Sequence, residues 1–464
     1  MSMVVQHNMQ AANANRMLGV TTSAQSKSTE KLSSGYKINR AADDAAGLTI
    51  SEKMRKQIRG LDKASSNAQD GVSSVQTAEG ALTEVHSMLQ RMNELAVQAS
   101  NGTNSKDTDR KAIQDEIDQL NTEIDRVAET TKFNEIYLLK GDDGEKTINL
   151  NAHDAGLKGT LVDNGSGKAT FTMKELSVGD SVSIGGKNYT IGSTAADAQK
   201  IVDAQEKAGG KVTVNGVEYT YNDTDKKWKD AAGADAGKIV IGDGDKVSDG
   251  TTTLTAMTDK KDATGAAKAD GVDDNDNSVI SAEKAYSLAK DELVAANHIG
   301  DTENTAAVAQ DTTNKNVFTI TTGSAKVANT LSFSLHVGAD ADMTNKITVD
   351  IDTMNSANLG IKGLNVTDKN GTAATYAIDA ISDAISKVSS QRSALGAVQN
   401  RLEHTIDNLD NISENTSSAE SRIRDTDMAK EMVNYSKNNI LAQAGQSMLA
   451  QANQSNQGVL SLLQ

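Results

Sequence analysis

The sequence is most informative in what it lacks. It contains no proline and no cysteine, and aromatic residues make up only 3% of its 464 residues. Proline removes a backbone donor and clashes with the preceding turn, so its absence favours long uninterrupted helices. The absence of cysteine excludes disulfides, thiolate metal sites and cysteine nucleophiles. With so few aromatic side chains, Ala, Leu, Ile, Val and Met must fill the contacts between helices.

Charge and hydropathy argue against two further classes of protein. The net charge is -16 at pH 7, whereas a nucleic-acid-binding protein needs a basic face, so we expect no nucleic-acid partner. No apolar run approaches the roughly 18 residues of a membrane helix, so we expect no membrane partner. The first residues, MSMVVQHNM, do not form a basic region followed by an apolar core. We therefore expect no cleaved secretory signal.

Both ends of the chain carry the apolar spacing of helices that pack on a partner helix. Steps of three and four from Met54 to Ala96 predict one long helix that ends near residue 99. The same spacing predicts a second helix over 113–127 and a third over 378–412. Three helices with one apolar face each should share a bundle. The chain between the second and the third must therefore leave the bundle and return to it.

The outermost segments, 2–34 and 426–463, have only a sparse apolar seam. At about 25 cal/mol per Å² of buried apolar area, such a seam hardly offsets the roughly 1–2 kcal/mol per residue of backbone entropy. We predict that both ends are disordered in the monomer and become helical when many copies pack. The predicted assembly seam comprises Val4, Ala11, Leu18, Leu441, Ala444, Met448, Ala452, Val459 and Leu462.

The middle of the chain carries strand patterns instead. The sequence Asn215-Gly216 predicts a type I′ turn in a hairpin over 212–221. One amphipathic helix is expected at 281–296, and we interpret 141–329 as an inserted domain. Alternating or β-branched runs predict further strands at 168–173, 181–184, 188–191, 238–241, 317–321, 331–337 and 347–351.

The candidates for catalysis or metal binding are weak. The six histidines are scattered along the chain. Gly165-Ser166-Gly167-Lys168 lacks the leading glycine and the following hydroxyl residue of a phosphate loop, so we interpret it as a turn. The acidic run 273–277 before Glu283 puts neither a carboxylate nor a glycine where a calcium loop needs them. We interpret it as a solvated loop, and we expect no enzymatic activity, metal or cofactor.

Several long motifs resemble one family. Residues 31–47 (KLSSGYKINRAADDAAG) and 89–104 (LQRMNELAVQASNGTN) resemble the N-terminal signatures of bacterial flagellins. Residues 395–402, 421–432 (SRIRDTDMAKEM) and 439–454 resemble the C-terminal signatures. The resemblance covers about 1–140 and 330–464, in the order found in the family.

The resemblance implies a mainly α fold with a β-rich insert. Both termini would form a long antiparallel helical rod or coiled coil, to which a small β-hairpin and an inserted β-rich domain are added. By this interpretation, two segments form the coiled-coil core of a filament, two form the helical rod domain and one forms the variable β-rich outer domain or domains. The core segments are 1–40 and 425–464, the rod segments are 41–140 and 330–424, and the outer insert is 141–329.

The resemblance also implies partners and a location. The chain would leave the cell through the flagellar type III apparatus, without a cleaved signal peptide. It would join an extracellular filament that drives swimming, with many copies of itself and with hook-associated junction and cap proteins at the filament ends. A flagellar export chaperone would bind the C-terminal helix. Host Toll-like receptor 5 would recognise the rod at Gln90, Arg91, Leu95, Gln98 and Glu116.

Three alternatives stay open at this point. A hook–filament junction protein shares the terminal signatures, although the 89–104 motif and the large insert favour the filament subunit. A chemoreceptor-like signalling hairpin would need a membrane helix in the same chain. An enzyme carried on a filament would need catalytic residues within 141–329, where the sequence offers none.

Overall fold

The computed structural model describes residues 8–106, 108–261, 269–368 and 370–462. They fall into two compact units. Unit 1 combines Met1–Ser73, Ser334–Val349 and Ala397–Gln464, and unit 2 combines Ser74–Phe333 and Asp350–Gly396. Two long helices, α2 (Ala45–Ser100) and α7 (Thr372–Arg424), contribute to both units. None of the helices within these ranges combines the length and the hydropathy of a membrane span.

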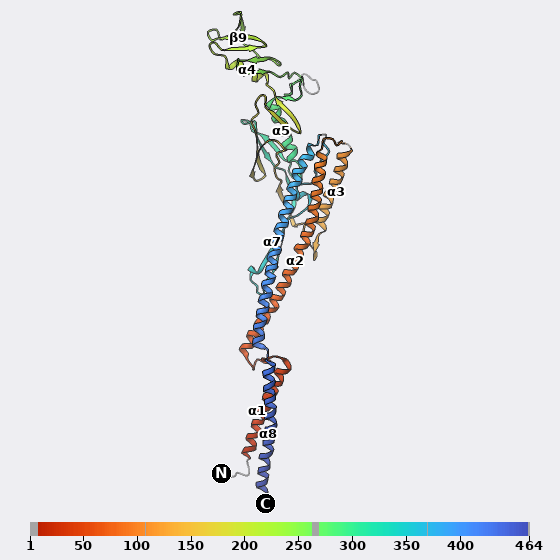
Figure 1. Ribbon diagram of the computed structural model, residues 1–464, viewed down its shortest axis with the longest axis vertical. Coiled ribbons are helices and arrows are strands. Elements are labelled where there is room, and N and C mark those ends of the chain that lie inside the picture. Colours follow the sequence, from red (N-terminus) through yellow and green to blue (C-terminus); the bar gives the residue numbers. More distant parts are fainter. Residues whose placement is uncertain (1–7, 107, 262–268, 369, 463–464) are drawn as a thin grey trace. The chain divides into compact units, whose positions relative to one another are not determined.

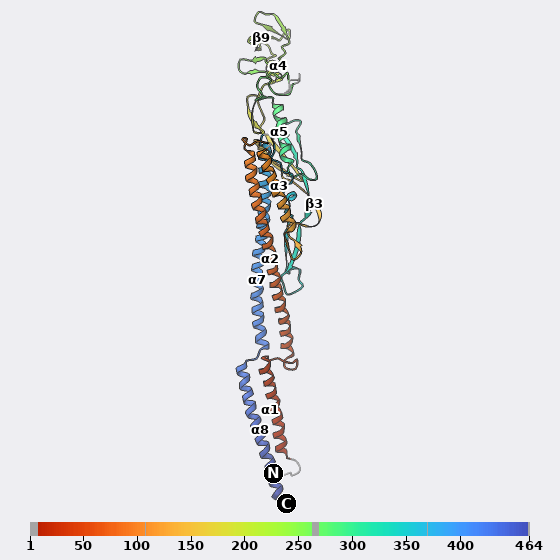
Figure 2. The ribbon, with the colours of Figure 1, turned by 90° about the vertical axis from the view of Figure 1, so that its right-hand side faces the viewer.

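Unit 1 contains two pairs of helices. Helices α1 (Met9–Ser34) and α8 (Met428–Leu462) lie side by side and antiparallel (Figures 1 and 2). The first part of α2 packs against the last part of α7, where Leu61 and Ala64 meet Leu409. Most of a hairpin of β18 (Leu331–His336) and β19 (Lys346–Ile351) also belongs to unit 1 and packs on this second pair, with a short 3-10 helix, η1 (Met343–Asn345), before β19.

Unit 2 contains the three-helix bundle that the apolar spacing predicts. The second part of α2, α3 (Asp109–Thr130) and the first part of α7 lie side by side in both views (Figures 1 and 2). Their shared face is fully buried and consists of aliphatic side chains, among them Leu82, Leu89, Ile117, Ile124, Ile381 and Val388. The helices confirm the predicted fold class: long terminal helices around a β-rich excursion.

The excursion leaves and rejoins the bundle through two paired strands. Short strands β1 (Lys132–Phe133) and β2 (Ile136–Tyr137) follow α3. Strand β3 (Asp142–Asn149) then pairs antiparallel with β17 (Ser324–Asn329), which lies at the far end of the excursion. The short helix α6 (Ser356–Leu359) follows β19 and precedes α7.

The excursion contains two separate cores. The first packs α5 (Ala282–Asn297) on strands around Phe171, Phe318 and Leu293. Its sheets have the orders β15-β16-β5-β4 and β14-β7-β6. The bounds are β4 (Gly159–Gly165), β5 (Lys168–Met173), β6 (Ser181–Ile184), β7 (Lys187–Ile191), β14 (Val279–Ile280), β15 (Ala307–Gln310) and β16 (Val317–Thr321).

The second core is smaller and is built around Trp228. Helix α4 (Ala195–Ala204) packs on a six-stranded sheet of order β11-β10-β9-β8-β12-β13. The bounds are β8 (Lys211–Val214), β9 (Val217–Asn222), β10 (Lys227–Asp230), β11 (Asp235–Gly237), β12 (Lys246–Ser248) and β13 (Thr253–Thr255).

Most local predictions are confirmed, and one strand is wrong. Asn215 and Gly216 have φ of 48° and 86°, as a type I′ turn requires. Ser166 and Gly167 form the turn between β4 and β5, as predicted. The strand predicted at 238–241 is absent, because β11 ends at Gly237 and the chain continues as a loop. Ile239 and Ile241 still pack on the Trp228 core, which explains their apolar character.

Candidate assembly and recognition surfaces

The contact between α1 and α8 is thin and uses small side chains. Leu18 of α1 lies over Gly445, where an added Cβ would come within 3.4 Å of its Cδ1. The Asn8 side chain donates a hydrogen bond of 3.1 Å to the carbonyl oxygen of Ala452. Among the described side chains of these two helices, only Ser28 and Ala442 are buried. A contact that buries so little contributes little to the stability of an isolated chain.

Helix α8 has a second, exposed apolar face. Ile440, Leu441 and Met448 are 67%, 50% and 63% exposed, and Val433 lies on the same side at helical spacing. Helix α1 likewise exposes Met9, Met17 and Val20. Exposed apolar surface of this extent marks an interaction site.

The predicted assembly seam therefore divides between two faces. Ala11, Leu18 and Ala452 are half-buried in the contact between α1 and α8. Leu441, Ala444 and Met448 point away from α1 into solvent. Val4 lies outside the described residues, and the side chains of Val459 and Leu462 lie outside the described part of α8.

The predicted receptor-binding residues lie mostly on an exposed face of α2 and α3. Arg91 Nε donates to Glu116 Oε1 at 2.9 Å, and Arg91 Nη1 donates to Glu94 Oε2 at 3.1 Å. These two hydrogen bonds raise the pKa of the Arg91 guanidinium, Glu116 contributing most. Gln90 and Gln98 are exposed on the same helix. The arrangement holds a cation at a fixed place on a rigid surface.

Leu95 corrects one of these expectations. Its side chain is only 2% exposed and belongs to the core of the helical bundle. It therefore offers almost no surface to a partner. Four of the five predicted contact residues remain on the accessible face: Gln90, Arg91, Gln98 and Glu116.

Arg110 is a polar anchor that the sequence patterns did not reveal. It is only 1% exposed, at the beginning of α3. Its guanidinium donates to the carbonyl oxygens of Ala99 at 2.8 Å, Asn101 at 3.1 Å and Asp368 at 3.0 Å. A cation suits the C-terminal end of α2, where carbonyl groups lack helical partners. Arg110 thus joins the end of α2 to the loop before α7.

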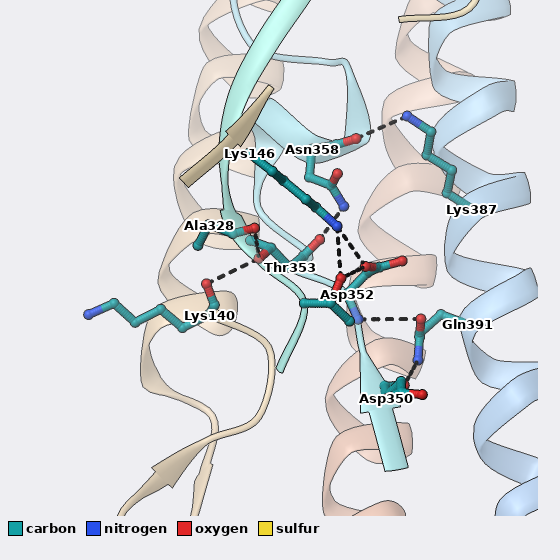
Figure 3. A network of polar contacts seen from close by, with 10 residues as sticks. Lys140, Lys146, Ala328, Asp350, Asp352, Thr353, Asn358, Lys387 and Gln391 are labelled. Carbon is teal, nitrogen blue, oxygen red and sulfur yellow. Dashed lines mark hydrogen bonds and ion pairs between the residues drawn. The ribbon is translucent and has the colours of Figure 1, made fainter. Parts of the chain in front are cut away.

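The base of the insert is held by a polar network (Figure 3). The Thr353 hydroxyl faces the carbonyl oxygens of both Lys140 and Ala328, each at 3.3 Å. These carbonyls lie where the chain enters the insert and where it returns. Gly141 adopts φ of 89°, and a Cβ there would come within 2.3 Å of the Thr353 Oγ1. One buried hydroxyl therefore brings together the two crossings of the chain.

Charged groups complete this network on either side. Lys146 Nζ donates to Thr330 Oγ1 at 2.8 Å and to Asp352 Oδ1 at 3.1 Å. Burial opposes ionisation of Asp352, but the hydrogen bonds from Thr330 and Lys146 outweigh it and lower its pKa. Helix α7 contributes Lys387, which donates to the carbonyl oxygen of Asn358 at 3.0 Å (Figure 3). Burial lowers the pKa of Lys387.

The described residues show no cluster with the chemistry of a metal centre. No group of three or more His, Asp or Glu side chains could hold a metal ion in this part of the chain. In the acidic run, Asp273 accepts backbone hydrogen bonds from Thr258 and Asn275, and Asp274 accepts them from Lys260 and Lys261. These carboxylates hold their own loop together.

Comparison with known proteins identifies the family. Residues 5–143 match the bacterial flagellin N-terminal helical region, and residues 378–463 match the bacterial flagellin C-terminal helical region. The chain is 40% identical to a flagellin of Clostridium tyrobutyricum, over 98% of this chain and 100% of the relative. It is 36% identical to flagellin D of Vibrio cholerae serotype O1, over the full length of both chains.

Two solved structures match this chain at low sequence identity and low TM-score. FliC from Burkholderia pseudomallei is 20% identical, with a TM-score of 0.25, over 71% of this chain and 99% of that one. Flagellar hook associated protein-3 from Legionella pneumophila is 14% identical, with a TM-score of 0.32, over 80% of this chain and 98% of that one. Both of these full-length relatives are flagellins, which are structural proteins and not enzymes. The chain belongs to the bacterial flagellin family, whose members homopolymerise into the extracellular flagellar filament.

Proposed function

We propose that α1 and α8 build the core of the filament by packing their exposed apolar faces against other copies. The observation that carries this proposal is the stripe of α8 formed by Ile440, Leu441 and Met448, which the same chain leaves uncovered. Burying a Leu or Met side chain that is otherwise exposed contributes about 1.5–3 kcal/mol. Repeated in every subunit, such contacts supply the stability that the pair of helices lacks alone.

Removal of both helices tests this role. A chain without residues 1–34 and 428–464 should remain soluble and keep the helical bundle of unit 2, as measured by circular dichroism. It should not elongate filament seeds in electron micrographs, whereas the full chain should. A chain lacking only 195–257, around the Trp228 core, is the control and should still elongate them. Seed growth by the doubly truncated chain would remove α1 and α8 from the assembly mechanism.

We further propose export through the flagellar type III apparatus, with an export chaperone covering α8 before secretion. The thin contact between α1 and α8 favours this route, because an end that is easily unfolded passes a narrow channel at little cost. The exposed stripe of α8 also needs a cover in the cell. Saturating chaperone should block seeded elongation. An unchanged elongation rate would contradict the proposal.

The same surfaces would engage the proteins at the two ends of the filament. We propose that α1 and α8 pack on the hook-associated junction protein at the base and on the cap protein at the tip. The assembled filament would then transmit motor rotation for swimming. Bacteria that express the doubly truncated chain should secrete no filament and should not spread in soft agar.

The exposed face around Arg91 would also be recognised by host Toll-like receptor 5. Gln90, Arg91, Gln98 and Glu116 would form the contact. Because two carboxylates already restrict the Arg91 side chain, it loses little conformational entropy on binding. This suits Arg91 to a central position in an interface.

The R91A variant should signal at least tenfold more weakly in receptor reporter cells. The control is R126A, which removes another exposed arginine that is ion-paired on α3. Equal signalling by the two variants would contradict this assignment.

A further inference from the structure

Unit 1 contains two linkers between consecutive helices, and the two linkers lie next to each other. Helix α1 ends at Ser34 and α2 begins at Ala45, while α7 ends at Arg424 and α8 begins at Met428. Figures 1 and 2 both show these two interruptions side by side. Each linker joins the pair α1 and α8 to the pair α2 and α7. The two linkers, 35–44 and 425–427, are together called the joint.

The two linkers are joined through their backbones. Tyr36 and Asp425 form an antiparallel bridge. The amide of Lys37 donates to the carbonyl oxygen of Arg424 at 2.6 Å, and the amide of Thr426 donates to that of Gly35 at 2.9 Å. Gly35 adopts φ of 76°, which ends α1 and turns the chain toward this bridge.

The side chain of Arg424 connects the joint to helix α2. The Arg424 guanidinium lies over the Tyr36 ring, 4.9 Å from its centroid. Its Nη1 lies 2.8 Å from Glu52 Oε1 and donates to Ser51 Oγ at 3.4 Å. The hydrogen bond from Arg424 is the main cause that lowers the pKa of Glu52. Arg424 thus touches the linker after α1 and the first turns of α2 at the same time.

The surroundings of Arg424 favour a single conformation. The Ser51 hydroxyl is fully buried and also donates to Glu420 Oε1 at 2.9 Å. A planar guanidinium can stack on an aromatic ring and donate in its own plane at once, which an ammonium group cannot do. A cation is also favoured at the last residue of α7 by the helix dipole.

We propose that Arg424 is a positioning residue that fixes the orientation of α1 and α8 relative to α2 and α7. This inference rests on the proposed role of α1 and α8 in the filament core. The orientation at this joint determines how the core of each subunit meets the rod around it. Arg424 therefore controls the elongation rate and the helical waveform of the filament.

Substitution of Arg424 with a matched control tests the inference. The R424Q variant removes the charge and the stacking plane. Arg422 is exposed, lies two residues away and has the same charge, so R422Q is the control. R424K keeps the ion pair with Glu52 and loses the planar stacking. Because the chain has no cysteine, spin labels at Lys27→Cys on α1 and Lys56→Cys on α2 report the joint without further changes.

The measurements use labelled subunits diluted into filaments of unlabelled protein. R424Q should broaden or shift the distance between the two labels, alter the waveform and slow seeded elongation at least tenfold. R424K should give an intermediate result, and R422Q should match the wild type. If R424Q does not fold, as judged by circular dichroism, R424K and Y36L provide the same comparison.

Each outcome has one meaning. Equal label distances, waveforms and elongation rates for R424Q and R422Q would overturn the role of Arg424, even if the filament proposal stands. Elongation by the chain without α1 and α8 would instead overturn the filament proposal on which the inference rests.

Discussion

Arginine side chains have two different roles in this chain, depending on whether they are exposed or buried. Arg91 is exposed and ion-paired with Glu94 and Glu116, so its pairs contribute little to the stability of the monomer. Arg110 is buried and donates to three backbone carbonyls, where the loss of a partner is costly. Arg91 is therefore available for recognition, whereas Arg110 is committed to the fold.

We expect R110M to destabilise the bundle of unit 2 by about 1–3 kcal/mol, because the buried carbonyl group of Ala99 and two partly buried carbonyl groups lose their donor. The free energy of unfolding, measured by urea denaturation, should fall accordingly. Lys111 is exposed next to it, so K111M is the control and should change stability by less than about 0.5 kcal/mol. Similar midpoints for the two variants would show that Arg110 does not cap α2.

The lowered pKa of Asp352 predicts how the base of the insert responds to acid. A carboxyl whose pKa is lower in the folded state stabilises that state above its ordinary pKa of about 3.9. The contribution is lost as the pH falls through the folded value. A nuclear magnetic resonance titration should therefore give Asp352 a pKa below the ordinary value. T330V should raise it, because it removes one of the hydrogen bonds that favour the carboxylate. A pKa that T330V leaves unchanged would contradict the assigned cause.

Among the elements, helix α8 most clearly presents two different apolar faces. Its face of Ala442, Gly445 and Leu449 meets α1, and its face of Leu441 and Met448 meets solvent. A helix that is apolar on two sides is complete only with more than one neighbour. The weak apolar spacing of its sequence follows from this division.

We expect L441N to leave the monomer unchanged and to slow seeded elongation by about tenfold or more. The loss of one buried Leu in each subunit contact is about 1.5–3 kcal/mol, and 1.4 kcal/mol corresponds to a factor of ten. The control Q446N changes an exposed residue elsewhere on α8. Elongation of L441N at the rate of Q446N would show that this face does not pack in the filament.

The sequence predicts elements whose signal is local. The helical spacing of α2, α3 and α7 and the Asn215-Gly216 turn depend on neighbours within a few residues, and all are present. The pairing of β3 with β17 joins segments separated by the whole insert, so no local pattern reveals it. The apolar residues Ile239 and Ile241 suggest a strand in the sequence, but they are apolar because they pack on the Trp228 core and not because they pair in a sheet.

The candidate surfaces were predictable to a smaller extent. Motif resemblance places Arg91 and Leu95 together, but only packing shows that Leu95 faces the core. The apolar spacing predicts seam residues on α8, but a weak periodicity cannot assign them to one of two faces. Arg110 carries no signal in the sequence, since a single arginine at the start of a helix is ordinarily solvated. Its role depends on the ends of α2 and α7 meeting in space.

At the scale of the whole molecule, net charge opposes assembly. Each subunit carries a net charge of -16, so copies repel one another before apolar faces meet. Raising the ionic strength from about 0.01 M to about 0.15 M shortens the screening length from about 30 Å to about 8 Å. We expect seeded elongation, followed by light scattering, to accelerate over this range. Sucrose at equal osmolarity is the control and should not reproduce the effect. A rate that falls with salt would contradict an assembly driven by apolar contacts against charge repulsion.

Amide hydrogen exchange in α1 and α8, compared between monomer and filament, tests the central claim most directly. The few buried side chains of these helices predict rapid exchange in the dilute monomer, while the bundle of unit 2 stays protected. In the filament the same amides should be protected to the level of the bundle. Equal and strong protection of α1 and α8 in both states would contradict the account, because the two helices would then be complete within one chain.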